Sequence, residues 1–273
     1  ETPTNPLITL GSNFGGTPIL EPYHKDGAKL RKFHLIVSNP PFKLDFSDYR
    51  DQLDSKGNKE RFFAGIPNVP KKDKDKMAIY LLFIQHVIHS LVSNGRAAIV
   101  VPTGFITAQS GIEKSIREHL VKNKMLGGVI SMPSNIFATT GTNVSILFID
   151  ASNQGDVILI DASNLGEKIK EGKNQKTVLS PDEEQQIIET FNAKKAVEDF
   201  SVVVSYAEIE AKNCSLSAGQ YFDVEINHVE ITPKEFTAKV TGFDARLSAL
   251  FGEAESLQKT IKKSLASLKF HES

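Results

Sequence analysis

The sequence is nearly free of cysteine, with Cys214 alone among 273 residues. One thiol excludes an intrachain disulfide framework, so a cytoplasmic location is expected by default. Long apolar runs are also missing: none reaches the roughly 18 residues of a membrane span, and no signal peptide is visible. We therefore expect no membrane partner. The 40% apolar content is enough for one sizeable core or two small ones.

Metal-ligand patterns are missing as well. His34, His86 and His89 have no cysteine or carboxylate partners at the spacing that metal sites use. We expect these histidines to have packing or surface roles, and we expect no metal site.

The tetrapeptide Asn39-Pro40-Pro41-Phe42 is the most informative feature that is present. It follows the apolar run 33–38, which we expect to be a buried strand. Two prolines cannot extend a sheet ladder, so the strand must end there. An amide, a carbonyl with no following N–H and an exposed aromatic ring then stand where open α/β sheets bind ligands. The alternative is a simple turn followed by a core phenylalanine.

The surrounding sequence alternates between apolar strand patterns and helical patterns. This alternation predicts an α/β fold with a largely parallel sheet covered on both faces. The last two strands have no clear helix between them, which leaves room for one to run antiparallel. We expect strands at 7–10, 33–38, 96–102, 127–133 and 143–150, helices at 77–92 and 112–121, and a helix stop at Ser93-Asn94-Gly95.

Residues 7 to about 200 resemble the catalytic modification subunit of type I restriction–modification enzymes, which are N6-adenine DNA methyltransferases. Each matching block is moderately specific, but their order and spacing together are highly specific. The blocks are a Gly-x-x-aromatic turn near Gly11, Asn39-Pro40-Pro41-Phe42, the helix with Phe83 and His86, the run 95–102, Ile116-Arg117, the run 132–143 and, beyond them, 213–221 and the terminal helix.

The resemblance implies a Rossmann-like, S-adenosylmethionine-dependent methyltransferase sheet with an antiparallel hairpin at one edge. Asn39, Pro40, Pro41 and Phe42 would be catalytic. The Asn39 side-chain oxygen and the Pro40 carbonyl would orient the adenine amine, which is a poor nucleophile. Phe42 and Phe137 would stack on a target base swung out of the duplex. The expected cofactor contacts are those of Gly11, Ser12, Asn13 and Asn39 with S-adenosyl-L-methionine.

One part of the family pattern is missing. The family carries a Gly-rich turn after its first strand that holds the methionine moiety, and no Gly-x-Gly turn follows a strand here. The chain also starts at Glu1 without Met. We therefore expect a truncated chain that is inactive by itself, with a sheet incomplete at its amino-terminal side.

Three regions are expected along the chain. Residues 1–151 would form the partial catalytic domain, 152–241 a mixed α/β extension and 242–273 a helical tail. Within the extension, the sequence predicts a helix start at Ser180-Pro181-Asp182-Glu183, a strand at 200–204 and a polar connector at 206–212. The long segment 43–76 is expected to be functional or mobile. Its mixed-charge run 71–76 favours a solvated loop over a phosphate-binding arm.

The tail carries apolar residues at alternating steps of four and three, which is a coiled-coil heptad seam with one polar position. Such a helix exposes apolar surface unless it packs on its own domain or on a partner. The resemblance favours docking on a separate specificity subunit or on another copy. The seam residues are Phe243, Leu247, Leu250, Ala254, Leu257, Ile261, Ser264 and Leu268.

These observations leave more than one function open. The first is N6-adenine DNA methylation, with a second modification subunit and a restriction subunit as further partners. The second is an assembly scaffold without activity of its own, and the third is methylation of RNA or of a protein glutamine. The net charge of −1 fits a subunit whose affinity for DNA comes mainly from a partner, and it does not exclude a non-DNA substrate. Base readout would then lie in another chain.

Overall fold

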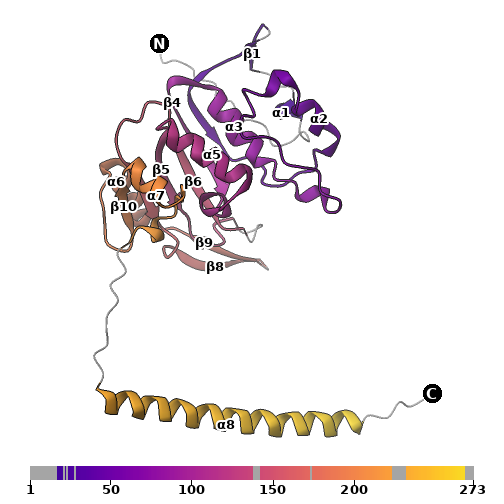
Figure 1. Cartoon of the computed structure of the whole chain (residues 1–273), viewed down its shortest axis with the longest axis vertical. Helices are drawn as coiled ribbons and strands as arrows, with labels where there is room; N and C mark the ends of the chain where they lie inside the picture. The colour runs from indigo at the N-terminus through magenta and orange to yellow at the C-terminus, as the bar shows by residue number, and fades with distance from the viewer. Residues whose placement is uncertain are drawn as a thin grey trace, which may run out of the picture. The chain divides into compact units, whose positions relative to one another are not determined.

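The computed structural model describes residues 17–20, 22, 24–27, 29–137, 142–172, 174–222 and 232–267. The chain forms two compact units: the first ends at Phe222 and the second contains a single long helix (Figure 1). The helices are α1 (Thr17–Leu20), α2 (Arg50–Leu53), α3 (Tyr80–His89), α4 (Gly104–Thr107), α5 (Gly111–Lys122), α6 (Pro181–Ala193), α7 (Tyr206–Ala211) and α8 (Pro233–Ala266). The strands are β1 (Lys25–Asp26), β2 (Lys29–Leu30), β3 (Phe33–Ser38), β4 (Leu91–Pro102), β5 (Leu126–Ser131), β6 (Val144–Asp150), β7 (Val157–Asp161), β8 (Glu167–Glu171), β9 (Asn174–Val178) and β10 (Ser201–Val204). The strand expected at 7–10 lies outside the described residues.

A six-stranded mixed sheet organises the first unit, in the order β10-β7-β5-β6-β4-β3. Strand β3 is parallel to β4, and β5 is parallel to β7. Strand β6 runs antiparallel to both of its neighbours, β4 and β5. Strand β10 also runs antiparallel to its neighbour β7. The α/β class is therefore confirmed. The antiparallel β6 belongs to the last predicted pair, but it lies inside the sheet and not in a hairpin at one edge.

One face of the sheet is covered by α3 and α5, which lie in front of it in Figure 1. Alternate strand residues point to this face, where Ile99 and Leu147 join the main core. Helix α6 covers the opposite face over β5 and β7, through a smaller cluster that includes Ile158 and Ile187.

Over β3 and β4, the face that α6 leaves uncovered is open. Leu35 and Val37 are 67% and 65% exposed, because they alternate with the buried Ile36 and Ser38 and point away from the core. The expectation of a buried strand covered on both faces is therefore wrong for β3, an edge strand of the described sheet. A cleft of about 420 Å³ lies on this face, lined by β3, β4, β6 and the end of α6.

The helix expected at 77–92 is shorter, because α3 covers only Tyr80–His89. The helix stop expected at Ser93-Asn94-Gly95 belongs instead to a strand. The amide of Ser90 closes α3 on the carbonyls of His86 and Val87. Residues 93–95 lie inside β4, where the register with β3 is interrupted. Gly95 is needed there because a Cβ would lie 2.8 Å from the carbonyl oxygen of Phe33.

Local capping signals explain the other boundaries. The predicted start of α6 at Ser180 is confirmed by a complete capping box. The connector expected at 206–212 is instead helix α7, since Ser205 and Glu208 form a second capping box and Ile209 is buried. Helix α8 begins at Pro233, earlier than the expected residue 242, because Thr232 and Glu235 form a third capping box. Across the described ranges, no helix is both long and apolar enough to cross a bilayer.

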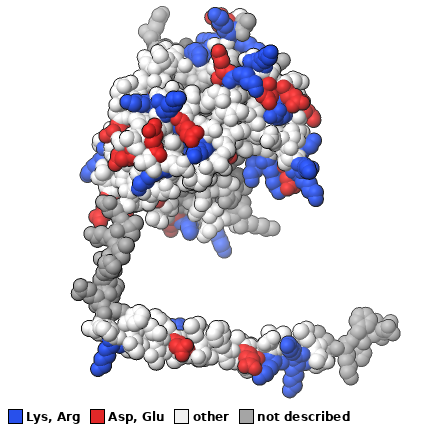
Figure 2. Space-filling view, in the orientation of Figure 1, with Lys and Arg blue, Asp and Glu red and all other residues white. Residues whose placement is uncertain are grey.

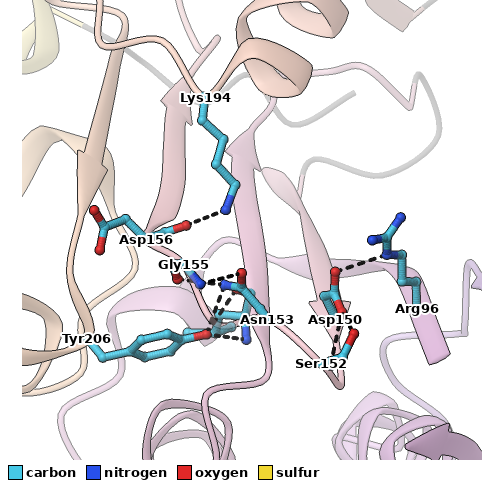
Figure 3. Close-up of polar contacts among 9 residues, drawn as sticks. Arg96, Asp150, Ser152, Asn153, Gly155, Asp156, Lys194 and Tyr206 are labelled. Carbon is cyan, nitrogen blue, oxygen red and sulfur yellow. Dashed lines mark hydrogen bonds and ion pairs between the residues drawn. The ribbon is translucent and has the colours of Figure 1, made fainter. Parts of the chain in front are cut away.

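Residues after 151 are bonded into the sheet (Figure 3). The Asn153 amide donates to the carbonyl of Leu126 at 2.5 Å and to the Tyr206 hydroxyl at 3.1 Å. That hydroxyl also accepts from the Leu126 amide at 3.0 Å, and Lys194 donates to the Asp156 carbonyl at 2.5 Å. Strands β7 and β10 extend the same sheet, so the fold shows no break near residue 151.

Arg117 is the largest fully buried side chain. Its Nε donates to the carbonyl of Cys214 at 2.7 Å, and its two terminal nitrogens donate to the carbonyls of Phe105 and Ala108. One guanidinium thus joins α5, the turn after β4 and a segment 97 residues farther along the chain. This contact brings together two of the sequence blocks that carry the family resemblance.

The long segment between Phe42 and α3 is held by two neighbouring side chains of that helix. Gln85 accepts from the Ala64 amide at 2.8 Å and donates to the Gly65 carbonyl at 3.0 Å. His86 Nδ1 accepts from Arg61 Nε at 3.0 Å. Burial lowers the pKa of His86 to about 2, with the nearby Arg61 charge contributing.

Replacing Arg117 is expected to destabilise the first unit strongly. Arg117→Met would leave three buried carbonyls without a donor, so the free energy of unfolding should fall by about 3 kcal/mol or more. Denaturant titration followed by circular dichroism measures the loss. Lys122→Met, on the exposed surface of the same helix, is the control and should change stability by no more than about 0.5 kcal/mol. Equal effects of the two substitutions would contradict the anchoring role.

Acid should destabilise the fold through His86. Below pH 6.5 the unfolded chain binds a proton at this residue, whereas the folded chain leaves it neutral down to about pH 2. Stability is therefore lost as pH falls, by about 1.4 kcal/mol for each pH unit below 6.5. Denaturant titrations between pH 6.5 and about 5 avoid most carboxylate titration. In His86→Asn, the amide oxygen can still accept a hydrogen bond from Arg61. The unfolding free energy of this variant should depend less steeply on pH, by the contribution of one proton. An unchanged slope would refute the assignment.

Candidate active site

Four parallel strands end at the same edge of the sheet. Strands β3, β4, β5 and β7 share one direction, so the segments that follow them emerge together, beside the start of the antiparallel β6. We call this the carboxyl edge. It comprises Asn39–Phe42 after β3, Thr103–Thr107 after β4, the 132–137 loop after β5 and the segment that follows β7.

The tetrapeptide after β3 presents one free polar group. Strand β3 ends at Ser38, whose partner in β4 is Ile99. Pro40 is buried, whereas Asn39 is exposed and its side chain makes no hydrogen bond to any residue that the structure describes. The unpaired side-chain amide of Asn39 is therefore held in place by Pro40, which is buried and has a fixed φ angle. It can donate to or accept from a ligand at this edge.

Phe42 belongs to a row of aromatic rings. Its ring packs edge-on against Tyr80 at 6.3 Å, and Tyr80 packs edge-on against Phe105 at the same distance. Phe42 is therefore half-buried against the core, not fully exposed as the sequence suggested. Burial raises the pKa of Tyr80, with Glu113 adding to the shift, so its hydroxyl stays neutral. Sequence reasoning missed Tyr80, although an aromatic residue at the start of the following helix was a possible signal.

The loop after β5 carries the second expected aromatic residue. The Met132 amide donates to the Val144 carbonyl at 3.0 Å, and Asn135 has a left-handed φ of 57°. Phe137 is half-buried. Strands β3 and β5 stand three positions apart, which separates their loops by about 14 Å. This separation leaves room for a flat ring between the loops, and the facing of Phe42 and Phe137 stays a prediction.

A hydroxyl pair at the centre of the edge was also missed. The Thr103 Oγ1 and Ser145 Oγ atoms lie 3.2 Å apart, and the Thr103 amide donates to the Asn143 carbonyl at 2.9 Å. These contacts tie the turn after β4 to the start of β6. Single Thr and Ser residues have no sequence signature that would have singled them out.

Of the expected cofactor contacts, only Asn39 can be placed. Gly11, Ser12 and Asn13 lie outside the described residues. Within the described part of the chain, no group of three or more His, Cys, Asp or Glu side chains could hold a metal ion. Acidic and basic side chains are mixed over most of the visible face of the first unit (Figure 2).

Comparison with known proteins shows which proteins this chain is similar to. The Type I restriction enzyme MpnII methylase subunit of Mycoplasma pneumoniae is 32% identical over 202 residues, which cover 74% of this chain and 35% of that protein. The Type I restriction enzyme MjaIX methylase subunit of Methanocaldococcus jannaschii is 28% identical, over 97% of this chain and 47% of that protein. The chain thus spans less than half the length of these relatives.

A solved structure has the same fold. It is the methyltransferase subunit of a type I restriction-modification system from Streptococcus thermophilus, 24% identical with a TM-score of 0.60, covering 76% of this chain and 41% of that one. The family model described as N-6 DNA Methylase matches residues 15–229. Because this match takes in most of the sequence and both aromatic loops of the carboxyl edge, the chain belongs to the N-6 DNA methylase family.

Proposed function

We propose that this chain is part of the modification subunit of a type I restriction–modification enzyme and methylates adenine N6 in DNA. The observation that carries the proposal is the Asn39 amide, exposed and without a hydrogen bond to the described residues, at the end of a parallel strand. Membership of the N-6 DNA methylase family supports it.

Two acceptors from the tetrapeptide hold the adenine amine. The amine has two N–H groups, and the Asn39 side-chain oxygen and the Pro40 carbonyl accept one each. This geometry favours the tetrahedral nitrogen of the transition state over the flat amine of the free base. S-adenosylmethionine, when bound, would supply the methyl group as an electrophilic carbon on a sulfonium sulfur, and Asn39 and Pro40 would hold the amine nitrogen toward it.

Phe42 and Phe137 stack on the two faces of the extruded adenine. Tyr80 supports this arrangement, since its ring fixes Phe42 from the core side. Stacking on one aromatic ring is worth about 1–3 kcal/mol per base, which offsets part of the cost of unstacking the base from the duplex.

Asn39 would contact S-adenosylmethionine at the same edge, together with Gly11, Ser12 and Asn13, which lie outside the described residues. The end of a parallel strand with a free amide fits such a ligand. The open face of β3 and the lack of a Gly-x-Gly turn favour weak cofactor binding by this chain when it is alone.

Helix α8 docks on a helical partner, the specificity subunit that supplies the target sequence. No residue of α8 is buried. Its seam residues Phe243, Leu247, Leu250, Leu257 and Ile261 are each at least half exposed. An apolar stripe of this length needs a partner in water. The same stripe favours the second candidate, a scaffold that assembles the enzyme without its own activity.

Methyl transfer into plasmid DNA separates these candidates. Full-length protein should methylate adenine when a specificity subunit is co-expressed and not without one. A scaffold would leave the DNA unmethylated in both cases. Transfer to RNA or to a protein glutamine, with unmodified DNA, would point to the third class.

Asn39→Ala is expected to abolish methylation by the assembled enzyme. The substitution removes an acceptor for the amine at an exposed turn position, so the fold should stay nearly unchanged. Asn94→Ala, at the opposite end of the sheet, is the matched control and should retain full turnover. Radiolabelled methyl transfer measures both. Retention of more than a tenth of the wild-type turnover in Asn39→Ala would refute the assignment.

The double substitution Leu250→Asp with Leu257→Asp should detach the chain from its specificity partner. Each apolar side chain lost from the interface removes roughly 1.5–3 kcal/mol before ordering costs. Ala245→Asp with Ser248→Asp adds the same charge to the opposite side of α8 and should leave binding intact. Co-purification reports the interface, and circular dichroism reports the fold. Unchanged co-purification would place the interface elsewhere, and unfolding would make the helix part of the chain's own core.

A further inference from the structure

The β8–β9 hairpin stands out because no role has been assigned to it. It follows β7, so it emerges from the carboxyl edge beside the 132–137 loop, which follows the neighbouring strand β5. In Figure 1 it lies beyond the lower ends of β5 and β6. Its ladder is regular, with five residue pairs from Glu167↔Val178 to Glu171↔Asn174. Five residues per strand give it a reach of about 17 Å from its base.

The base of the hairpin is fixed to the proposed active site. The Thr177 amide donates to the Asn135 carbonyl, in the loop that carries Phe137, at 3.0 Å. On the other strand, the Gly166 amide donates to the Glu183 carboxylate at 2.8 Å. Gly166 has a left-handed φ of 86°, and a Cβ there would lie 2.6 Å from the Thr177 methyl carbon. The hairpin is therefore held in place by specific contacts on both of its strands.

One face of the hairpin is basic. Lys168 pairs with Thr177 and Lys170 with Gln175, so strand alternation places these four residues on one face with no carboxylate. Both lysines are exposed, and neither has an ion pair among the residues that the structure describes. The sequence from Gly166 to Val178 holds four lysines and two glutamates in a chain of net charge −1.

We propose that Lys168 and Lys170 contact the phosphate backbone of the DNA duplex that flanks the target base. The two side chains lie two strand residues apart, about 7 Å. That distance is comparable to the spacing of phosphates along a duplex, where each strand carries one phosphate per about 3.4 Å of helix axis. The proposal rests on the proposed function for its choice of DNA, and it adds an element that grips the substrate beside the reacting base.

Salt-dependent DNA binding by the full chain tests this proposal. Lys168→Gln with Lys170→Gln removes two phosphate contacts, so the slope of log affinity against log salt should fall by about 1.8. Over a fourfold increase in salt, the variant should lose about 12-fold less affinity than the wild type. The probe is a short fluorescent duplex that contains adenine, and thermal melting checks that the exposed substitutions leave the fold intact.

The control is Lys122→Gln with Lys124→Gln. It removes the same charge from exposed positions just before β5, at the opposite edge of the sheet, and should leave the slope unchanged. Equal slopes for the two variants, or no salt-dependent duplex binding by the wild type, would overturn the proposal. A loss of binding to RNA or to the specificity subunit, with an unchanged DNA slope, would also overturn it.

Measuring both variants in the Asn39→Ala background separates the two ideas. The hairpin effect should persist there, because it requires binding and no methyl transfer. The proposed function is scored separately, by methylation with the assembled enzyme that keeps Asn39. If the slope changes but that enzyme never methylates DNA, the proposed function fails and the hairpin contact stands. If DNA is methylated and the slope does not change, only the hairpin contact fails.

Discussion

The buried guanidinium of Arg117 is the interaction on which the geometry of the proposed active site depends. A charge without solvent is costly unless hydrogen bonds satisfy it, and here three backbone carbonyls do so. They come from the turn after β4 and from Cys214, so the guanidinium fixes both segments against α5. Phe105, one of these acceptors, packs on Tyr80, which packs on Phe42. The position of Phe42, the proposed stacking ring, therefore depends on the buried charge of Arg117.

At the carboxyl edge, one residue holds the backbone in place and its neighbour exposes a polar group. Pro40 is buried and locks the turn, whereas the adjoining Asn39 keeps a free amide. The long segment after Phe42 is likewise anchored, because Gln85 and His86 bind its backbone and Arg61 from inside the fold. A pre-arranged acceptor loses little conformational entropy when the substrate arrives, which is what orientation of a weak nucleophile requires.

The two surfaces that we propose as contacts for macromolecular partners attract those partners through different physical forces. Helix α8 offers apolar side chains, whose burial is largely insensitive to salt. The β8–β9 hairpin offers lysines, whose attraction to phosphates weakens as salt rises. With a net charge of −1 and mixed charges over the visible surface (Figure 2), the electrostatic contribution is local. This division fits a subunit that assembles through one surface and touches its substrate through another.

Local signals in the sequence were enough to predict five of the six strands of the main sheet, the helices α3, α5, α6 and α8, and the turn that carries Asn39. Proline chemistry ends β3, and the Ser180–Glu183 capping box starts α6, because both act within a few residues. Tertiary structure alone decided that Arg117 is buried, that Tyr80 supports Phe42, and that one face of β3 is open. An apolar run shows that a strand has faces to bury, but only its distant neighbours determine which of them are covered.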